Sequence, residues 1–137
     1  MDELDLELTP LVFVYGTLKY GCSNWSWALS KEEYIGPRVT KDKYLLANRG
    51  FPYAFPHTLD IPEELLRQVQ GDVFEISNAR TLMRLDALEG EGWHYDRVLI
   101  QTTQDETCWM YVQNDLTMVQ SCGACHQTEE GYWKWNG

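Results

Sequence analysis

The stretch Leu11-Val12-Phe13-Val14-Tyr15-Gly16-Thr17-Leu18 is the starting point for predicting the fold. Its first five residues form an apolar run between Pro10 and Gly16, a pattern typical of a buried strand. A strand that ends in glycine and turns sharply exposes successive backbone N–H groups, which can bind an anion or stabilise an oxyanion. An isolated Gly-Thr turn is more often a plain strand-to-loop connection. The turn is therefore a candidate site that needs support from elsewhere in the sequence.

The clearest helix in the sequence is expected to begin after Ser77 or Asn78 and to end at Gly90. Serine and asparagine are both good N-caps, and glycine commonly ends a helix. The apolar residues between these limits recur at helical spacing and predict a buried stripe. This stripe consists of Ala79, Leu82, Leu85 and Leu88.

Glu89, at the carboxyl end of this helix, is the second candidate site residue. The helix dipole is negative there and disfavours a carboxylate by roughly 0.3–1 kcal/mol. The neighbouring acids Asp86 and Glu91 act in the same direction, and burial would add to the effect. These influences raise the pKa of a glutamate toward the range that a general base requires. The alternative is a solvent-exposed helix-end acid, which is the more common environment for glutamate.

The rest of the pattern predicts an α+β fold with a curled or barrel-like sheet and short helices packed outside it. Further strands are expected at 34–40, 43–47, 69–76, 95–102 and 107–113, and a short helix capped by Ser23 or Asn24 is expected to run through Leu29. Residues 49–56 contain two prolines and a glycine, so we expect a loop there. The Gly36-Pro37 pair predicts an irregular or edge strand. The aromatic segment 132–135 is too apolar to be a free tail.

Composition limits the classes of partner. The 137 residues suit one domain, 1–137, and the 21 acidic against 11 basic residues give a net charge of −10. Such a charge repels phosphate backbones and anionic lipids, so we expect neither nucleic acid nor membrane as a partner. No apolar run approaches the roughly 18–20 residues of a membrane span. The acidic start lacks the features of a secretory signal, which predicts a cytoplasmic protein, and we expect that start to be solvated.

The four cysteines, Cys22, Cys108, Cys122 and Cys125, are expected to be reduced thiols. The segment Cys122-Gly123-Ala124-Cys125-His126 matches the c-type haem pattern, but haem attachment normally requires export. Zinc would need four ligands, and only Cys22 and Cys108 remain to complete a set. The sequence therefore predicts no metal and no cofactor.

Taken together, these features resemble the gamma-glutamylcyclotransferase-like family. The matching blocks follow the family's order over about 100 residues: 12–19 (VFVYGTLK), 50–52 (GFP), 71–76 (GDVFEI), 85–90 (LDALEG), 95–97 (YDR) and 109–112 (WMYV). The resemblance implies a small mixed β-barrel in which Tyr15, Gly16, Thr17 and Leu18 bind the glutamyl part of a substrate. It also implies that Glu89 is the catalytic acid/base, and Thr17 is similar to the residue found in the gamma-glutamylamine branch.

The chemistry that the resemblance implies needs few groups from the protein. In a gamma-glutamyl amide, the α-amine of the substrate can attack the γ-carbonyl, release an amine and leave 5-oxoproline. Because this nucleophile is already tethered, no enzyme nucleophile, metal or cofactor is required. The expected partner is thus a small gamma-glutamyl molecule.

Some segments depart from the family pattern. Residues 56–70 have no counterpart and are expected to shape the leaving-group side of the pocket, and the tail from Met118 is also unmatched. For Arg97 we favour a structural ion pair, and for Tyr95 and Tyr111 aromatic packing. A binding protein that reuses the pocket without turnover is the main alternative function, and a metal or redox module built on the cysteines is a third. The oligomeric state is left open.

Overall fold

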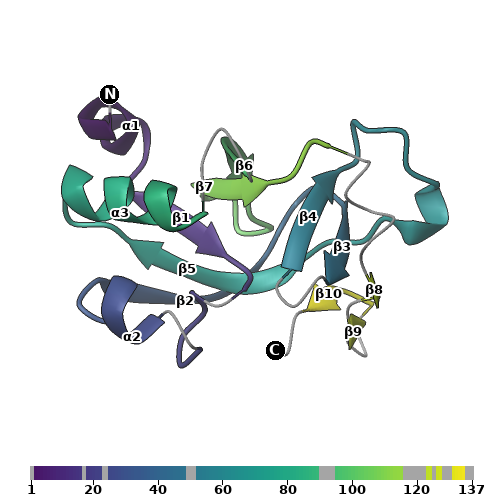
Figure 1. The fold of residues 1–137 in the computed structure, drawn as a ribbon, viewed down its shortest axis with the longest axis horizontal. Helices are drawn as coiled ribbons and strands as arrows, with labels where there is room; N and C mark the ends of the chain where they lie inside the picture. Colours follow the sequence, from purple (N-terminus) through teal and green to yellow (C-terminus); the bar gives the residue numbers. More distant parts are fainter. Residues whose placement is uncertain are drawn as a thin grey trace.

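The computed structural model describes residues 2–16, 18–22, 25–48, 52–89, 95–115, 123–124, 126–127 and 131–134. Its main element is a five-stranded sheet with the strand order β2-β5-β1-β7-β6 (Figure 1). These strands are β1 (Leu11–Val14), β2 (Glu33–Val39), β5 (Gln70–Glu75), β6 (Asp96–Gln101) and β7 (Thr107–Val112). The central strand β1 pairs antiparallel with β5 and parallel with β7. Val12, Phe13 and Val14 are all buried, because both faces of a central strand are covered.

One of the smaller sheets contains a strand that we predicted to be a loop. Strands β3 (Tyr44–Asn48), β4 (Pro52–Pro56) and β8 (Gly123–Ala124) form one sheet, and β9 (His126–Gln127) pairs with β10 (Trp133–Lys134). We expected residues 49–56 to be a loop, but β4 pairs with β3 along its whole length. Proline is compatible with an edge strand and with the first residue of a strand. Pro52 and Pro56 stand at the two ends of β4, and β4 is at the edge of its sheet.

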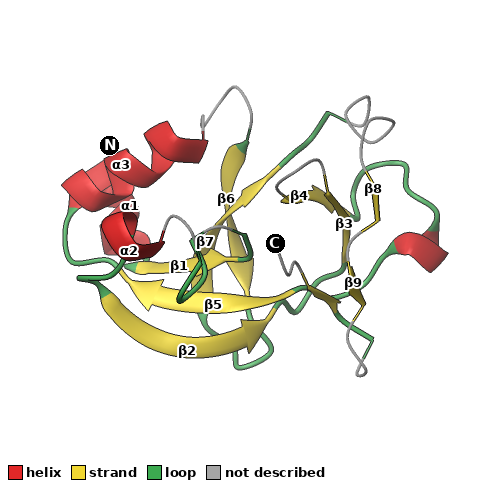
Figure 2. Ribbon diagram, turned by 60° about the horizontal axis from the view of Figure 1, so that its bottom comes forward, coloured by secondary structure: helices red, strands yellow, loops and turns green. Residues whose placement is uncertain are grey.

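Three helices gather at one end of the five-stranded sheet (Figures 1 and 2). They are α1 (Asp2–Leu8), α2 (Trp25–Ala28) and α3 (Ala79–Glu89), and a short 3-10 helix, η1 (Glu63–Leu65), lies at the opposite end. Within the described residues, no helix has the length and apolar character needed to cross a bilayer.

The predicted helix at 79–89 is confirmed, with its cap. The Asn78 side-chain oxygen accepts the backbone N–H of Thr81 at 3.0 Å, as an N-cap does. Leu82 and Leu85 are fully buried, but Leu88 is 37% exposed, so the predicted stripe was wrong at its last position. The predicted helix end at Gly90 and the caps at Ser23 or Asn24 lie outside the described residues.

The sheet is curled and meets itself at one end. Thr40 and Thr102, just beyond β2 and β6, form an isolated bridge, and the N–H of Thr103 donates to the carbonyl of Val39 at 2.9 Å. Figure 2 shows the bend of β2 toward this contact. The α+β class is confirmed. A continuous ladder between β2 and β6 is absent from the described residues, so a closed barrel is not confirmed.

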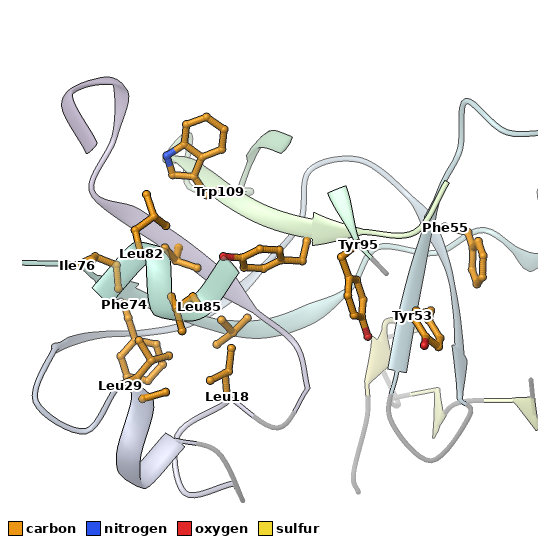
Figure 3. Close-up of a cluster of buried hydrophobic side chains, with 14 of the residues drawn as sticks. Leu18, Leu29, Tyr53, Phe55, Phe74, Ile76, Leu82, Leu85, Tyr95 and Trp109 are labelled. Carbon is orange, nitrogen blue, oxygen red and sulfur yellow. The ribbon is translucent and has the colours of Figure 1, made fainter. Parts of the chain in front are cut away.

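Two clusters of buried side chains lie on opposite faces of the five-stranded sheet. The cluster beneath the helices joins Leu82 and Leu85 of α3 to Leu18 and Phe74 (Figure 3). The other cluster holds Phe13, Met110 and Trp133, among others. Trp133 is only 9% exposed and its indole N–H donates to the carbonyl of Leu65 at 3.2 Å, so the prediction that 132–135 is not a free tail is confirmed at this residue.

Candidate functional site

The turn after β1 is held against the core by its side chains. Tyr15 is 5% exposed, and its hydroxyl donates to the carbonyl of Tyr111 at 2.6 Å and accepts the N–H of Ala54 at 3.3 Å. Leu18 is 2% exposed, within the cluster beneath the helices. With both side chains turned inward, what these residues can offer a ligand is mainly backbone. Thr17, whose resemblance to the gamma-glutamylamine branch was noted above, lies outside the described residues.

Gly16 lies at a close approach between the turn and β4. A Cβ atom at this position would stand 3.0 Å from Cγ of Pro52, a tighter contact than side chains normally make. The carbonyl of Gly16 accepts the N–H of Lys19 at 3.0 Å, which closes the turn. Glycine at position 16 therefore lets the turn pack directly on Pro52.

An ion pair between Asp86 and Arg97 fixes the last turn of α3. The carboxylate of Asp86 accepts Nε of Arg97 at 2.7 Å and the hydroxyl of Tyr111 at 2.6 Å. Arg97 also donates to the carboxylate of Asp5 in α1 at 2.8 Å. Burial alone would lower the pKa of the Arg97 guanidinium, but its hydrogen bonds to Asp5 and Asp86 raise that pKa above its ordinary value. Arg97 is therefore a permanent cation between two acids, and the predicted structural ion pair is confirmed.

The two predicted site segments converge on Tyr111. The backbone carbonyl of Tyr111 accepts the hydroxyl of Tyr15, at the start of the turn. The hydroxyl of Tyr111 donates to Asp86, one helical turn before Glu89. The structure describes the backbone of Glu89 as the last residue of α3, while its side chain lies outside the described atoms. The ends of β1 and α3 are thus connected through a single buried residue of β7, and the acid/base role of Glu89 stays a prediction.

The electrostatic expectation for Glu89 needs one correction. The sequence suggested that Asp86 disfavours the Glu89 carboxylate as a neighbouring like charge. In the structure the charge of Asp86 is paired with that of Arg97, which offsets this repulsion. The position at the helix carboxyl end, which also disfavours a carboxylate, is confirmed.

Tyr95, the residue before β6, packs against β4. Its ring stacks on Tyr53 with a centroid distance of 5.0 Å, and its hydroxyl donates to the carbonyl of Pro52 at 2.9 Å. Because Pro52 also contacts Gly16, Tyr95 braces the turn indirectly. The predicted packing roles of Tyr95 and Tyr111 are confirmed.

From the sequence we did not predict that Asp5 belongs to this network. We also did not predict that Asp86 braces it. The expectation that the acidic start is solvated was wrong for Asp5, whose side chain is 26% exposed and paired with Arg97. The carbonyl of Asp5 also accepts the indole N–H of Trp109 at 3.1 Å. Acidic and apolar residues alternate over positions 3–8, which is the period of a strand and not of a helix, so the local pattern did not indicate α1.

The other candidate sites are separate from this network. A surface pocket of about 340 Å³ lies at the opposite end of β7, where residues 101 and 107 pair, and contains none of the predicted site residues. Cys108 is buried, and burial raises the pKa of its thiol to about 12, so it is a poor metal ligand or nucleophile. Cys122 and Cys125 lie outside the described residues, and those that are described contain no cluster of three or more metal-binding side chains.

Comparisons with known proteins identify the family of this chain and its fold. Residues 12–135 match the family model described as "Gamma-glutamyl cyclotransferase, AIG2-like". The gamma-glutamylcyclotransferase family protein YtfP of Escherichia coli K12 is 37% identical over 102 residues, which cover 74% of this chain and 80% of that protein. The corresponding protein of Citrobacter rodentium is 39% identical over 118 residues, covering 80% and 90%. The crystal structure of a mouse AIG2-like protein superposes with a TM-score of 0.67 at 22% identity and covers 93% of this chain and 95% of that one, which shows the shared fold. The chain therefore belongs to the gamma-glutamylcyclotransferase, AIG2-like family.

Proposed function

We propose that this protein is a cyclotransferase that cleaves gamma-glutamyl amides into 5-oxoproline and a free amine. Family membership supports the reaction class. The observation that carries the proposal for this chain is the double role of Tyr111, which connects the turn at Tyr15 to the helix that ends at Glu89. A positioned base next to a turn rich in backbone N–H groups is the minimum that this reaction needs.

The proposed mechanism uses the substrate's own amine as nucleophile. Glu89 accepts a proton from the α-ammonium, and the resulting amine attacks the γ-carbonyl carbon, forming the new C–N bond of a five-membered ring. Backbone N–H groups of the turn at 15–18 stabilise the oxyanion. When the original amide C–N bond breaks, Glu89 returns this proton to the departing nitrogen. The ring nitrogen then loses its second proton through Glu89 to the released amine, which leaves as an ammonium ion, so the reaction is balanced without a cofactor.

For the substrate class we propose gamma-glutamylamines over glutathione, and this finer assignment depends on Thr17. The segment 56–70, expected on the leaving-group side, contains η1, which lies at the far end of the molecule from α3 in Figures 1 and 2. Its residue Arg67 instead stacks over Trp133, with 5.3 Å from the guanidinium carbon to the ring centroid. The expected role of residues 56–70 on the leaving-group side stays a prediction.

The test is to incubate the purified full chain with a panel of gamma-glutamylamines and with glutathione, and to measure 5-oxoproline release. We expect release from the gamma-glutamylamines with the higher kcat/KM. A preference for glutathione would overturn the substrate class but keep the reaction. If gamma-glutamyl compounds bind and no 5-oxoproline forms from any of them, the chain is a binding protein and the proposal is wrong.

A further inference from the structure

Asp72 of β5 holds the loop that follows the candidate glutamyl-binding turn. It pairs in register with Val14, the last residue of β1, so it lies beside the point where the turn begins. One oxygen of its carboxylate, Oδ2, accepts the backbone N–H of Tyr20 at 2.8 Å. The other, Oδ1, accepts the hydroxyl of Tyr34 at 3.1 Å. Asp72 therefore joins the backbone of the loop to strands β5 and β2 at once.

Two backbone hydrogen bonds of the loop are local. The N–H of Lys19 donates to the carbonyl of Gly16 at 3.0 Å, and the N–H of Cys22 donates to the carbonyl of Lys19 at 2.8 Å. Such bonds fix the shape of the loop but not its position against the sheet. The buried Leu18 side chain and the hydrogen bond from the N–H of Tyr20 to Asp72 both contribute to that position.

The strand that carries Asp72 lies very close to the end of β1. A Cβ atom at Gly71 would come within 2.4 Å of the carbonyl oxygen of Val14, so only glycine fits there. The adjacent Asp72 is thereby kept within reach of the loop. Tyr20 also packs against Tyr34, with ring centroids 4.9 Å apart, so the loop and β2 contact each other on the outer side of the Asp72 carboxylate.

We propose that Asp72 is a positioning residue for substrate binding: by accepting the N–H of Tyr20 it fixes the described part of the loop, residues 18–22, beside the backbone N–H groups of the candidate turn. The inference depends on the proposed function, because it assigns Asp72 to the binding of the glutamyl part. Asp72 itself does not contact the reacting atoms. Its loss should displace N–H groups that bind the glutamyl part, which raises KM. Because the same groups stabilise the oxyanion, kcat should fall as well.

The structure offers matched variants for the test. Asp72→Ala removes both bonds. Tyr34→Phe removes only the second bond, on the side of β2, and leaves the loop anchored. Asp72→Asn is the conservative variant, because its amide oxygen can accept the N–H of Tyr20 while its amide nitrogen donates to the hydroxyl of Tyr34. If Asp72→Ala does not fold, Asp72→Ser replaces it, since the shorter hydroxyl cannot span both bonds.

The experiment measures 5-oxoproline release by each full-length variant, together with thermal unfolding and hydrogen exchange of the loop amides. We expect Asp72→Ala to raise KM about three- to tenfold, the effect of losing one hydrogen bond at a partly exposed site. We expect Asp72→Asn and Tyr34→Phe to keep KM within about twofold of wild type. Exchange at the Tyr20 amide should accelerate in Asp72→Ala and stay slow in Tyr34→Phe.

The outcomes separate this inference from the proposed function. An active wild type whose Asp72→Ala variant keeps the wild-type KM would overturn the inference alone. A rise of KM in Tyr34→Phe equal to that in Asp72→Ala would also overturn it, because general loss of stability would then explain both. A wild type that releases no 5-oxoproline from any gamma-glutamyl amide would overturn the proposed function and the inference with it.

Discussion

Replacing Tyr111 with phenylalanine removes one hydroxyl from the residue that connects the turn to α3. That hydroxyl donates to Asp86 at 2.6 Å, and a hydrogen bond to a charged group contributes about 1.5–3 kcal/mol to stability. Asp86 keeps its bonds from Arg97, so its carboxylate is not left without partners, and we expect a loss near the lower end, about 1.5–2 kcal/mol. The backbone bond from Tyr15 is unaffected because it ends on the carbonyl of Tyr111.

Tyr95→Phe is the matched control for this variant. Its hydroxyl also forms a hydrogen bond within the protein but donates to the neutral carbonyl of Pro52, so we expect a loss of only about 0.5–1.5 kcal/mol. Urea unfolding at pH 7, followed by tryptophan fluorescence with equal m-values, measures both free energies. Tyr111→Phe should also lower kcat, since it loosens the last turn of α3. A Tyr111→Phe variant no less stable than Tyr95→Phe, or one with unchanged kcat, would refute the bracing role assigned to Tyr111.

Two further predictions concern stability. Asn78→Ala should lower the free energy of unfolding by about 1 kcal/mol, because it removes the N-cap of α3, and a urea titration that shows no loss would contradict the cap. In the native state, wild type and Cys108→Ala should react with the same number of thiol-reagent molecules. After denaturation, wild type should react with one more molecule than Cys108→Ala. Because burial raises the pKa of Cys108 to about 12, the unfolded chain loses this proton first as pH rises above about 9. Wild type should then lose up to about 1.4 kcal/mol per pH unit more than Cys108→Ala between about pH 9 and 12, and equal slopes would contradict the buried thiol.

The elements that could be predicted are those whose sequence pattern is local. The apolar run before Gly16 and the helix capped at Asn78 both carry their signal within a few residues. β4 could not be predicted from proline content, because whether proline is tolerated depends on whether the strand lies at an edge. That position is set by tertiary structure: β4 pairs with β3 on one side, and on the other side Ala54 bonds with the N–H of Gln113 and the hydroxyl of Tyr15, with no further strand ladder among the described residues.

The site could be predicted only in part, for a similar reason. The turn at 15–18 and the helix end at Glu89 are visible as short motifs. The way they are joined is not, because Tyr111 lies 96 residues from Tyr15 and 25 residues from Asp86. Helix α1 was missed because its support is tertiary: Asp5 is paired with Arg97, 92 residues along the chain. Patterns within one segment cannot report such pairings.

The most direct test of the account is the kinetics of Glu89→Gln with a gamma-glutamylamine as substrate. Glutamine keeps the size of the side chain and one hydrogen-bond acceptor but cannot accept the ammonium proton. We predict that kcat falls about 10²–10⁴-fold, the usual contribution of a positioned base, while binding of the substrate changes little. Glu64→Gln, the same substitution on the exposed surface of η1, should leave both constants at wild-type values. A Glu89→Gln variant that retains substantial turnover would contradict the assignment of Glu89 as the acid/base.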